Sequence, residues 1–307
     1  MASTAKKKRQ VGMFTTKKDD LVGWLFTAPA LICFLAFVMF PTCAMIGLSF
    51  TKYKMLRPPE WIGLDNFVRL FTKDAKLVKV AMNTIKLSTV SVVISILIGL
   101  ILALLITSRK NGIYSYVIRL FYFFPNIVAA SFIAIVWSIL FSKDTGVVNY
   151  YLHRLLGIGP IGFLTDQKYA LWSVVFIDVW RNIGFIMFIL LAGIRSISDS
   201  YYEAAALDGA NSLQIATRVT IPLLTPSILL VMVIQIIGAL KTFDIPNIMT
   251  EGGPNDATRT MAMYVYDMAF TRMSMGYACC VSVIFVVAIM LVTVLQFGLS
   301  NKWVHYD

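Results

Sequence analysis

Six long apolar runs constrain the fold of this chain more than any other feature. Each holds about twenty residues, the length that an α-helix needs to cross the hydrocarbon core of a bilayer. The chain is 58% hydrophobic and only 14% charged, which leaves no stretch for a sizeable soluble domain. We therefore expect an all-α polytopic membrane protein with six transmembrane helices. The apolar runs cover 21–50, 87–107, 117–141, 170–194, 226–243 and 278–299.

The basic amino-terminal end orients these spans. The first run is too long for a signal-peptide core and lacks a small-x-small cleavage site, so we expect it to be retained. Lys and Arg are nearly balanced between the two sides of a six-span arrangement, and their total does not decide the orientation. The charge before the first span usually decides the orientation, and here it predicts that both termini are cytoplasmic. The basic residues concerned are Lys6, Lys7, Lys8, Arg9, Lys17 and Lys18.

The first external loop is also unusually basic. It is expected to be a solvated loop, and the alternatives are an amphipathic surface segment or a patch that attracts an anionic solute or lipid. The net charge of +11 does not indicate nucleic-acid binding in a chain this apolar, so we expect no nucleic-acid partner. The loop's cations are Lys52, Lys54, Arg57, Arg69, Lys73, Lys76 and Lys79.

Motifs for catalysis are missing from the sequence. There is no phosphate-binding loop, no GxSxG elbow, no HExxH motif and no paired-carboxylate arrangement. The cysteines fall in or beside the spans without a CxxC pair, which is typical of packing residues: Cys33, Cys43, Cys279 and Cys280. We therefore expect a chain that is not an enzyme and that holds neither a metal ion nor a cofactor of its own.

A polar segment between the fourth and fifth runs has the pattern of two short helices. Ser200 followed by Glu203 has the spacing of a capping box, which would start the first helix. Gly209 can adopt the left-handed conformation that ends it. Asn211-Ser212 offers a cap for the second helix, which Pro222 is expected to end. On the residues alone, Glu203 either caps its own helix or serves a docking role.

This segment resembles the signature loop of permease subunits in ABC importers. The shared pattern is Glu-Ala-Ala, three residues, Gly, nine residues and an Ile-x-Leu-Pro-like close, here Val219-x-Ile221-Pro222. The resemblance implies a cytoplasmic loop that inserts into a groove of an ATPase subunit. Leu213 and Ala216 stand where many sugar-type members have aromatic residues, which implies a shallower contact. The coupling residues implied are Glu203, Ala204, Ala205, Asp208, Gly209, Ala210 and Pro222.

Further motifs are similar to those of the carbohydrate group of this family. They are the segment 61–67, Asn83-Thr84 and Gly252-Gly253-Pro254, with Glu251 where the family often has Gly. The chain looks like the first of two paired permeases of the maltose and glycerol-phosphate type. That resemblance implies a core of five helices preceded by an extra first helix, and alternating access in a bacterial or archaeal plasma membrane. It also implies a second homologous permease, two ATP-binding subunits that use ATP and Mg²⁺, and an external solute-binding protein.

The same resemblance divides the chain into four parts. We expect a basic cytoplasmic tail over 1–20 and the first transmembrane helix with its external loop over 21–79. The permease core would cover 80–300, with the coupling loop at 198–225, before a short cytoplasmic tail over 301–307.

Polar side chains inside the spans are the candidate solute path. A charge at mid-membrane costs on the order of 3 kcal/mol unless it is paired or hydrated. In the fourth span, Asp178, Arg181, Asn182 and Phe185 recur at helical spacing and share one face. The alternative is that Asp178 and Arg181 form an ion pair that only pins a neighbouring helix.

The fifth and third spans add uncharged groups to this path. In the fifth span, Lys241 and Asp244 are three residues apart, and Gln235 and Thr242 share a different face. In the third span, Asn126, Ala130 and Trp137 line up, and the indole is a candidate to stack on a pyranose ring or, alternatively, to pack. A small-residue stripe in the second span predicts close helix packing: Ser91, Ser95, Gly99 and Ala103.

Two other classes of protein compete with the importer. One is a stand-alone channel or secondary carrier for small polar solutes, since Pro125-Asn126-Ile127 recurs as Pro246-Asn247-Ile248. The other is a sensor or assembly protein that uses the polar hairpin only to bind a cytoplasmic partner. Uptake by the purified chain alone distinguishes the carrier, and partner binding without transport distinguishes the sensor.

Overall fold

Helices form nearly all the regular structure of the computed structural model, which describes residues 17–54, 57–107 and 112–305. The amino-terminal half contains α1 (Lys17–Phe34), the π-helical η1 (Leu35–Met39), α2 (Phe40–Ser49), β1 (Thr51–Lys52), β2 (Glu60–Trp61), α3 (Asp65–Thr72), α4 (Ala75–Thr107), α5 (Gly112–Ile127), α6 (Ala130–Leu140) and α7 (Val147–Leu156). The carboxy-terminal half contains α8 (Ala170–Ser196), α9 (Asp199–Leu207), α10 (Ser212–Ile215), η2 (Ala216–Thr220), α11 (Ile221–Leu223), α12 (Thr225–Leu240), α13 (Asp244–Thr250), α14 (Met261–Tyr266), η3 (Asp267–Thr271) and α15 (Met275–Ser300).

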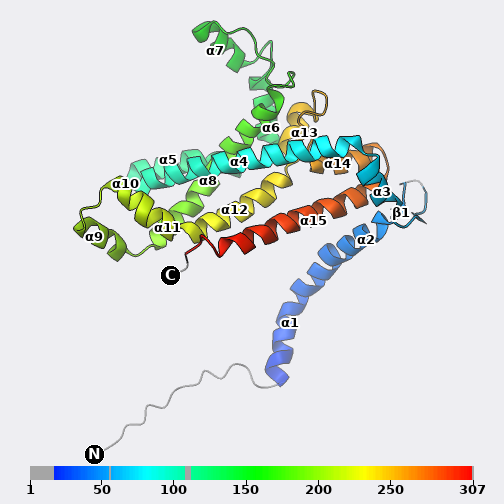
Figure 1. Ribbon diagram of the computed structural model, residues 1–307, viewed down its shortest axis with the longest axis horizontal. Helices are drawn as coiled ribbons and strands as arrows, with labels where there is room; N and C mark the ends of the chain where they lie inside the picture. Colours follow the sequence, from blue (N-terminus) through cyan, green and yellow to red (C-terminus); the bar gives the residue numbers. More distant parts are fainter. Residues whose placement is uncertain (1–16, 55–56, 108–111, 306–307) are drawn as a thin grey trace, which may run out of the picture.

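The long helices confirm the predicted class of all-α polytopic membrane protein. Within the described residues, 5 helical stretches are long and apolar enough to cross a membrane, or up to 6 if the bent pair α5 and α6 counts as one span. Helices α4, α8, α12 and α15 run side by side, with α9–α11 at one end and α3 at the other (Figure 1). The carboxy terminus lies at the α9–α11 end, where the His305 amide donates to Thr225 Oγ1 at 3.0 Å.

The third span is not the single straight helix that the sequence predicts. Helices α5 and α6 are bent by 97° relative to each other. Pro125 lies in the last turn of α5 and has no amide hydrogen for the helical ladder. Ala129 then takes a non-helical conformation, with φ −57° and ψ 135°, before α6 begins. The predicted alignment of Asn126, Ala130 and Trp137 on one helical face is therefore wrong.

The second span begins twelve residues earlier than its apolar run, at Ala75 rather than at Leu87. The added turns are amphipathic, so hydrophobicity alone does not detect them. Val80, Asn83 and Thr84 are buried on this extension, while its lysines lie on the outside. The first twelve residues of α4 thus extend the helix beyond the apolar run.

Small residues bring α4 and α8 into close contact, as the sequence predicts. Ser91, Ser95 and Ala103 are at most 2% exposed. A Cβ added at Gly99 would lie 2.5 Å from Cγ2 of Ile186 on α8. This packing of α4 on α8 forms the rigid centre of the molecule.

Within the described residues, the first span joins the body mainly at its α2 end. Helix α2 packs against α15, and the short antiparallel pair β1 and β2 follows it, with Thr51 opposite Trp61. Asn66 on α3 closes this junction, since its Nδ2 donates to the carbonyls of Ser49 and Thr51, each at 2.9 Å. Of the basic residues expected to orient the chain, Lys6, Lys7, Lys8 and Arg9 lie outside the described residues, and Lys17 and Lys18 are the first residues of α1.

Candidate coupling loop and polar cavity

The polar segment after α8 folds into the predicted pair of helices, but its first cap differs from the prediction. Ser198 is the N-cap of α9, and its side chain accepts a hydrogen bond from the Ser200 amide. The predicted capping box of Ser200 and Glu203 is therefore wrong, because the helix begins two residues earlier. The Glu203 side chain is exposed and makes no hydrogen bond within the part of the chain that the structure describes. Glu203 is thus free to contact another subunit.

Gly209 ends α9 in the left-handed conformation that the sequence predicts, with φ +74°. The Gly209 amide donates to the Ala206 carbonyl at 3.1 Å, and the Ala210 amide donates to the Ala205 carbonyl at 3.0 Å. These two bonds form a Schellman motif, which satisfies the last carbonyls of the helix. The positions that the importer resemblance singles out around Gly209 are therefore those that make this turn.

A capping box at Asn211 starts the second helix, which confirms one of the two predicted caps. The Gln214 amide donates to Asn211 Oδ1 at 2.9 Å, and the Asn211 amide donates to Gln214 Oε1 at 2.8 Å. Both helices of the knob, defined here as residues 198–224, are thus closed by local hydrogen bonds. Its turns are therefore fixed by neighbouring residues, while Leu224 at its end packs into the core.

Pro222 does not end the second helix, contrary to the prediction. Helix α10 runs through the π-helical η2 into α11, and Pro222 lies in the first turn of α11. The Ile221 amide reaches back to the Ala216 carbonyl, and this wider turn accommodates the missing amide of the proline. Leu224 follows and is 1% exposed in the core at the base of α12. The knob is therefore joined to α12 by a nearly continuous helical rod.

The outer surface of the knob carries apolar side chains. Leu207 is 89% exposed, Leu213 is 72% exposed and Tyr201 is 44% exposed. The knob projects at the end of the long helices opposite α3 (Figure 1). Sequence reasoning missed Leu207 and Tyr201, although an unpaired Leu beside a predicted helix stop is a usable signal of a contact surface.

A second candidate site is a cavity of about 380 Å³ between α5, α8 and the end of α12. Every residue of the predicted solute path except Trp137 lines it. The lining comprises Asn126, Ala130, Asp178, Arg181, Asn182, Phe185, Ile234, Gln235, Gly238, Ala239, Lys241, Thr242, Phe243, Asp244 and Ile245.

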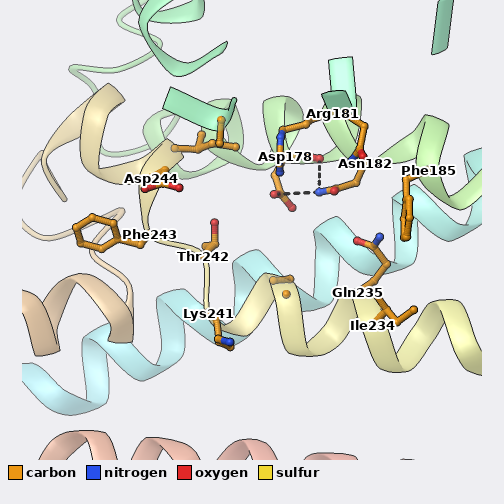
Figure 2. Close-up of a pocket in the computed structure, with 15 residues that line it drawn as sticks. Asp178, Arg181, Asn182, Phe185, Ile234, Gln235, Lys241, Thr242, Phe243 and Asp244 are labelled. Carbon is orange, nitrogen blue, oxygen red and sulfur yellow. Dashed lines mark hydrogen bonds between the residues drawn. The ribbon is translucent and has the colours of Figure 1, made fainter. Parts of the chain in front are cut away.

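A break in the fifth span shapes one wall of this cavity. Helix α12 ends at Leu240, and α13 begins at Asp244, so Lys241 and Asp244 are not neighbours on one helix as predicted. The segment between them is held by the Thr260 hydroxyl, which donates to the Thr242 carbonyl at 2.9 Å. Figure 2 shows Thr242 pointing toward α8 and Lys241 pointing away from it.

The fourth span contributes the charged wall of the cavity. The alternative interpretation predicts an ion pair between Asp178 and Arg181, which the structure does not show. No ion pair within 4.0 Å joins Asp178 to Arg181 among the described residues. Asn182 Nδ2 instead donates to Asp178 Oδ1 at 3.2 Å and to the Asp178 carbonyl at 2.9 Å (Figure 2). Nε of Arg181 is buried without a hydrogen-bond partner. A buried cationic donor left unpaired is costly, which favours a bound group that accepts from it.

Trp137 lies outside the cavity. Its ring packs against Phe141, Phe176 and Trp180, with centroid distances of 5.0, 5.4 and 5.6 Å. The packing interpretation of this indole therefore fits the structure. The rings that do line the cavity are Phe185 and Phe243, and Phe243 escaped sequence reasoning because it follows the unpredicted break in the fifth span.

Charged side chains lock the end of the molecule that lies opposite the knob, near α3. Asp256 pairs with Lys76 at 2.9 Å and with Arg259 at 2.5 Å, and Asn83 Nδ2 donates to the Asp256 carbonyl at 2.7 Å. Part of the basic first loop is thus bound to the loop after α13 instead of being solvated. Burial raises the pKa of Asp256, but the hydrogen bonds and charges of Lys76 and Arg259 outweigh it and hold that pKa below its usual value.

Asp74 forms a second lock at the start of α4. Its carboxylate accepts from the hydroxyls of Tyr264 and Tyr277 and from the backbone amides of Lys76 and Leu77. Burial raises the pKa of Asp74, and the four hydrogen bonds more than offset this, so the pKa lies below its usual value. The same hydrogen bond to Asp74, together with burial, raises the pKa of Tyr264.

Glu251 stands in a strained position at the end of α13. It is the C-cap of that helix and takes the left-handed conformation, with φ +51°. Glycine adopts this conformation without strain, so the Gly that the resemblance leads us to expect at this position would fit the turn better than Glu251 does.

Parallel apolar helices, a polar cavity among them and a helical knob at one end together define a membrane permease. The chain belongs to the family of binding-protein-dependent transport system inner membrane components, whose model matches residues 95–305.

Similar proteins span the whole chain. The probable ABC transporter permease protein YesP of Bacillus subtilis (strain 168) is 36% identical, over 100% of this chain and 97% of that protein. The lactose transport system permease protein LacF of Rhizobium radiobacter is 36% identical, over 92% of this chain and 95% of that protein. A chain in the crystal structure of a bacterial alginate ABC transporter, in complex with an alginate pentasaccharide-bound periplasmic protein, is similar with a TM-score of 0.82. It is 26% identical, and the match covers 93% of this chain and 96% of that chain.

Proposed function

We propose that this permease moves a carbohydrate, an oligosaccharide or a polyol derivative into the cell as one of two different permeases in an ATP-driven importer. The observation that carries the proposal is the self-capped knob at one end of a permease that has a polar cavity between its spans. The names of similar proteins support the substrate class, since they include lactose and alginate transporters.

The knob supports an association with ATP-binding subunits. Two such subunits would hydrolyse ATP with Mg²⁺, and this chain would bind neither directly. The exposed Leu207, Leu213 and Tyr201 offer apolar contact area, and Glu203 offers a charge at the same surface. The coupling residues remain those of the predicted motif: Glu203, Ala204, Ala205, Asp208, Gly209, Ala210 and Pro222.

The rod that follows the knob suggests how movement reaches the solute. The capped helices, η2, α11 and α12 form a chain of helical segments from Asn211 to Leu240, where the cavity begins. Closure of the ATPase pair would displace the knob, tilt α12 and move the Lys241–Phe243 wall relative to α8. Alternating access follows from such a tilt, with an external solute-binding protein delivering the solute to the opposite end.

The cavity supports solute binding by uncharged and charged groups together. Asn182, Gln235 and Thr242 offer donors and acceptors suited to hydroxyls, and Phe185 and Phe243 offer flat apolar faces for a sugar ring. Arg181 supplies an unused donor. The remaining polar members of the proposed path are Asn126, Asp178, Lys241 and Asp244.

The proposed orientation places the knob and both termini in the cytoplasm of a bacterial or archaeal cell. The carboxy-terminal residues contact the base of α12 at the knob end, which supports a shared side for the knob and that terminus. The outer end with α3, α14 and the Asp256 lock would then face the external binding protein.

Reconstitution tests the proposal. The chain is purified gently from its native membrane with the subunits that accompany it, placed in proteoliposomes and assayed for sugar uptake with and without ATP. We expect uptake only with ATP, with an ATPase and a second permease in the preparation. ATP-independent uptake by the chain alone would instead establish the channel or secondary carrier.

A further inference from the structure

The α7 arm, defined here as residues 141–169, extends away from the long helices (Figure 1). Helix α5 has 16 residues and a length of about 24 Å, which is somewhat less than the hydrocarbon thickness of a bilayer. The chain then bends by 97° into α6. If α5 crosses the bilayer, α6 therefore runs parallel to the membrane surface, near the boundary of the leaflet opposite the knob. It carries α7 at its far end.

Helix α7 has a buried polar side chain and an exposed apolar stripe, which is the reverse of a helix in a water-soluble domain. Its polar Asn149 is 5% exposed and points into the arm, where Nδ2 donates to the Ile161 carbonyl at 2.9 Å and Oδ1 accepts from the Ile161 amide at 2.9 Å. Its apolar face points outward, with Val147 48%, Tyr151 54% and Leu155 74% exposed. These three residues recur every four positions and form one stripe.

Helix α6, which leads into the arm, also has an exposed apolar surface. Helix α6 leaves four large side chains exposed along its length, which are Phe132 at 67%, Ile135 at 49%, Val136 at 54% and Ile139 at 64%. The polar residues 142–145 separate this surface from the stripe on α7. An exposed apolar surface next to a membrane span has the hydrocarbon boundary as its natural neighbour.

The border of the stripe on α7 carries cations and a tyrosine hydroxyl, and the hollow beside α7 is lined by Val147 and Tyr151 as well. Arg154 Nη1 donates to the Tyr150 hydroxyl at 2.9 Å, and Lys143 lines the same hollow beside the helix. His153 also lies there, and Asp144 is the acidic residue in that lining. Basic groups and tyrosines that border an apolar stripe match the boundary between lipid headgroups and acyl chains, where long cationic side chains can reach the phosphates.

We propose that α7 is an interfacial helix that rests on the bilayer leaflet opposite the knob. Val147, Tyr151 and Leu155 would enter the acyl boundary, and Lys143 and Arg154 would contact the phosphates of anionic lipids. The arm then anchors α6 and the adjoining cavity wall at a fixed depth. This inference requires only that the chain is embedded in a membrane and is independent of the transported solute.

Spin labels on opposite sides of α7 test the inference. Leu155→Cys and His153→Cys are made in a background in which Cys33, Cys43, Cys279 and Cys280 are replaced by Ala. The complex is purified from native membranes and placed in nanodiscs of phosphatidylethanolamine and phosphatidylglycerol. The accessibility of each nitroxide to oxygen and to a water-soluble nickel chelate gives its depth. Both positions are exposed in the chain, so they form a matched pair.

We expect the label at 155 to lie about 5–10 Å below the lipid phosphates, with high oxygen and low nickel accessibility, and the label at 153 to remain open to nickel. Equal nickel accessibility at both positions would show a solvated helix. Shielding of position 155 from both reagents would show a protein subunit on this face. Either outcome overturns the proposal.

A photoactivatable phosphatidylglycerol provides a second test on the unmodified chain. We expect cross-linked lipid on peptides from the α7 arm, and its yield should fall in Lys143→Gln/Arg154→Gln. Absence of lipid from the arm, while lipid is found on α15 of the same sample, would also overturn the proposal.

Discussion

Arg181 is the side chain that most strongly favours the proposed solute site in the cavity. Its guanidinium lies in a membrane span, its Nε has no partner, and the nearby Asp178 is engaged by Asn182 instead. A protein that used Arg181 only to pin a helix would pair it directly. The helical spacing of these residues was enough to predict that they share a face, but no sequence pattern shows which of them bond to each other.

Removal of this donor should weaken uptake more than removal of the neighbouring cation. We expect Arg181→Gln to lower uptake by about tenfold or more, because a charge-assisted hydrogen bond contributes about 1.5–3 kcal/mol. Lys241→Gln should have a smaller effect, since Lys241 points away from α8. Initial uptake rates in proteoliposomes check this. Equal losses in the two variants would contradict the role given to Arg181.

Gly209 should be needed for coupling and not for membrane insertion. Its φ of +74° strains any residue with a side chain, although an added Cβ would meet nothing within 4 Å. We expect Gly209→Val to distort the turn at a cost of about 1–2 kcal/mol and to abolish ATP-driven uptake, with normal amounts of protein in the membrane. Gly159→Val is the control, because Gly159 also lies in open space but has no positive φ.

At the scale of helices, the apolar runs located the spans but not their breaks and extensions. Pro125 was a visible signal for the bend between α5 and α6. The break after Leu240 had a similar signal in Pro246, whose missing amide leaves the Thr242 carbonyl without a helical donor. What the sequence could not show is that the Thr260 hydroxyl donates to that carbonyl instead. The first turns of α4 were not predicted, because their lysines lower the average hydrophobicity of an amphipathic helix.

The contact between α4 and α8 should be intolerant of larger side chains. A side chain at Gly99 would displace Ile186, so we expect Gly99→Val to destabilise the protein by about 1–3 kcal/mol. Gly298→Val in α15 is the matched control, since its added Cβ would meet nothing within 4 Å. Thermal unfolding in detergent compares the two variants, and similar melting temperatures would contradict the packing described for α4.

The two outer locks should make stability depend on acid. Asp74 and Asp256 have pKa values below the ordinary 3.8, so their stabilisation is fully present above that pH and is lost as the pH falls through the lowered values. We expect the melting temperature to fall steeply below about pH 4. Asp74→Asn/Asp256→Asn should start lower at pH 7 and show a flatter decline, as differential scanning fluorimetry would reveal. An unchanged slope would assign the acid sensitivity to other groups.

At the scale of the whole molecule, the knob and the cavity lie at opposite ends of one helical path. The sequence predicted the two helices of the knob, the turn at Gly209 and the cap at Asn211, because each depends on residues a few positions apart, but it misplaced the first cap and the end of the second helix. The cavity needed the structure, because its walls come from three spans whose relative rotation depends on packing. Trp137 shows why helical spacing alone does not identify the cavity residues. Its spacing predicted a place in the solute path, but its ring packs against Phe141 and Trp180.

Contact between the knob and an ATPase should depend on Glu203 more than on the other acidic residue of α9. Both Glu203 and Asp199 are exposed, and only Glu203 belongs to the proposed coupling motif. We expect Glu203→Ala to reduce ATP-driven uptake strongly and to lower recovery of the ATPase with the purified permease. Asp199→Ala should leave both unchanged. Normal recovery and uptake with Glu203→Ala would remove Glu203 from the contact.

The break in the fifth span has a consequence for water. The residues 241–243 leave the helical ladder about 24 Å along a span, and backbone that is not helical is tolerated at such depth only where protein buries it or where it faces a hydrated space. The polar cavity beside it offers such a space. We therefore expect the cavity to hold water before the solute arrives, so that the solute exchanges its hydration shell for side chains in a compartment already filled with solvent. The barrier that keeps ions from leaking must then reside in the apolar helices on either side of this compartment, separate from the residues that recognise the solute.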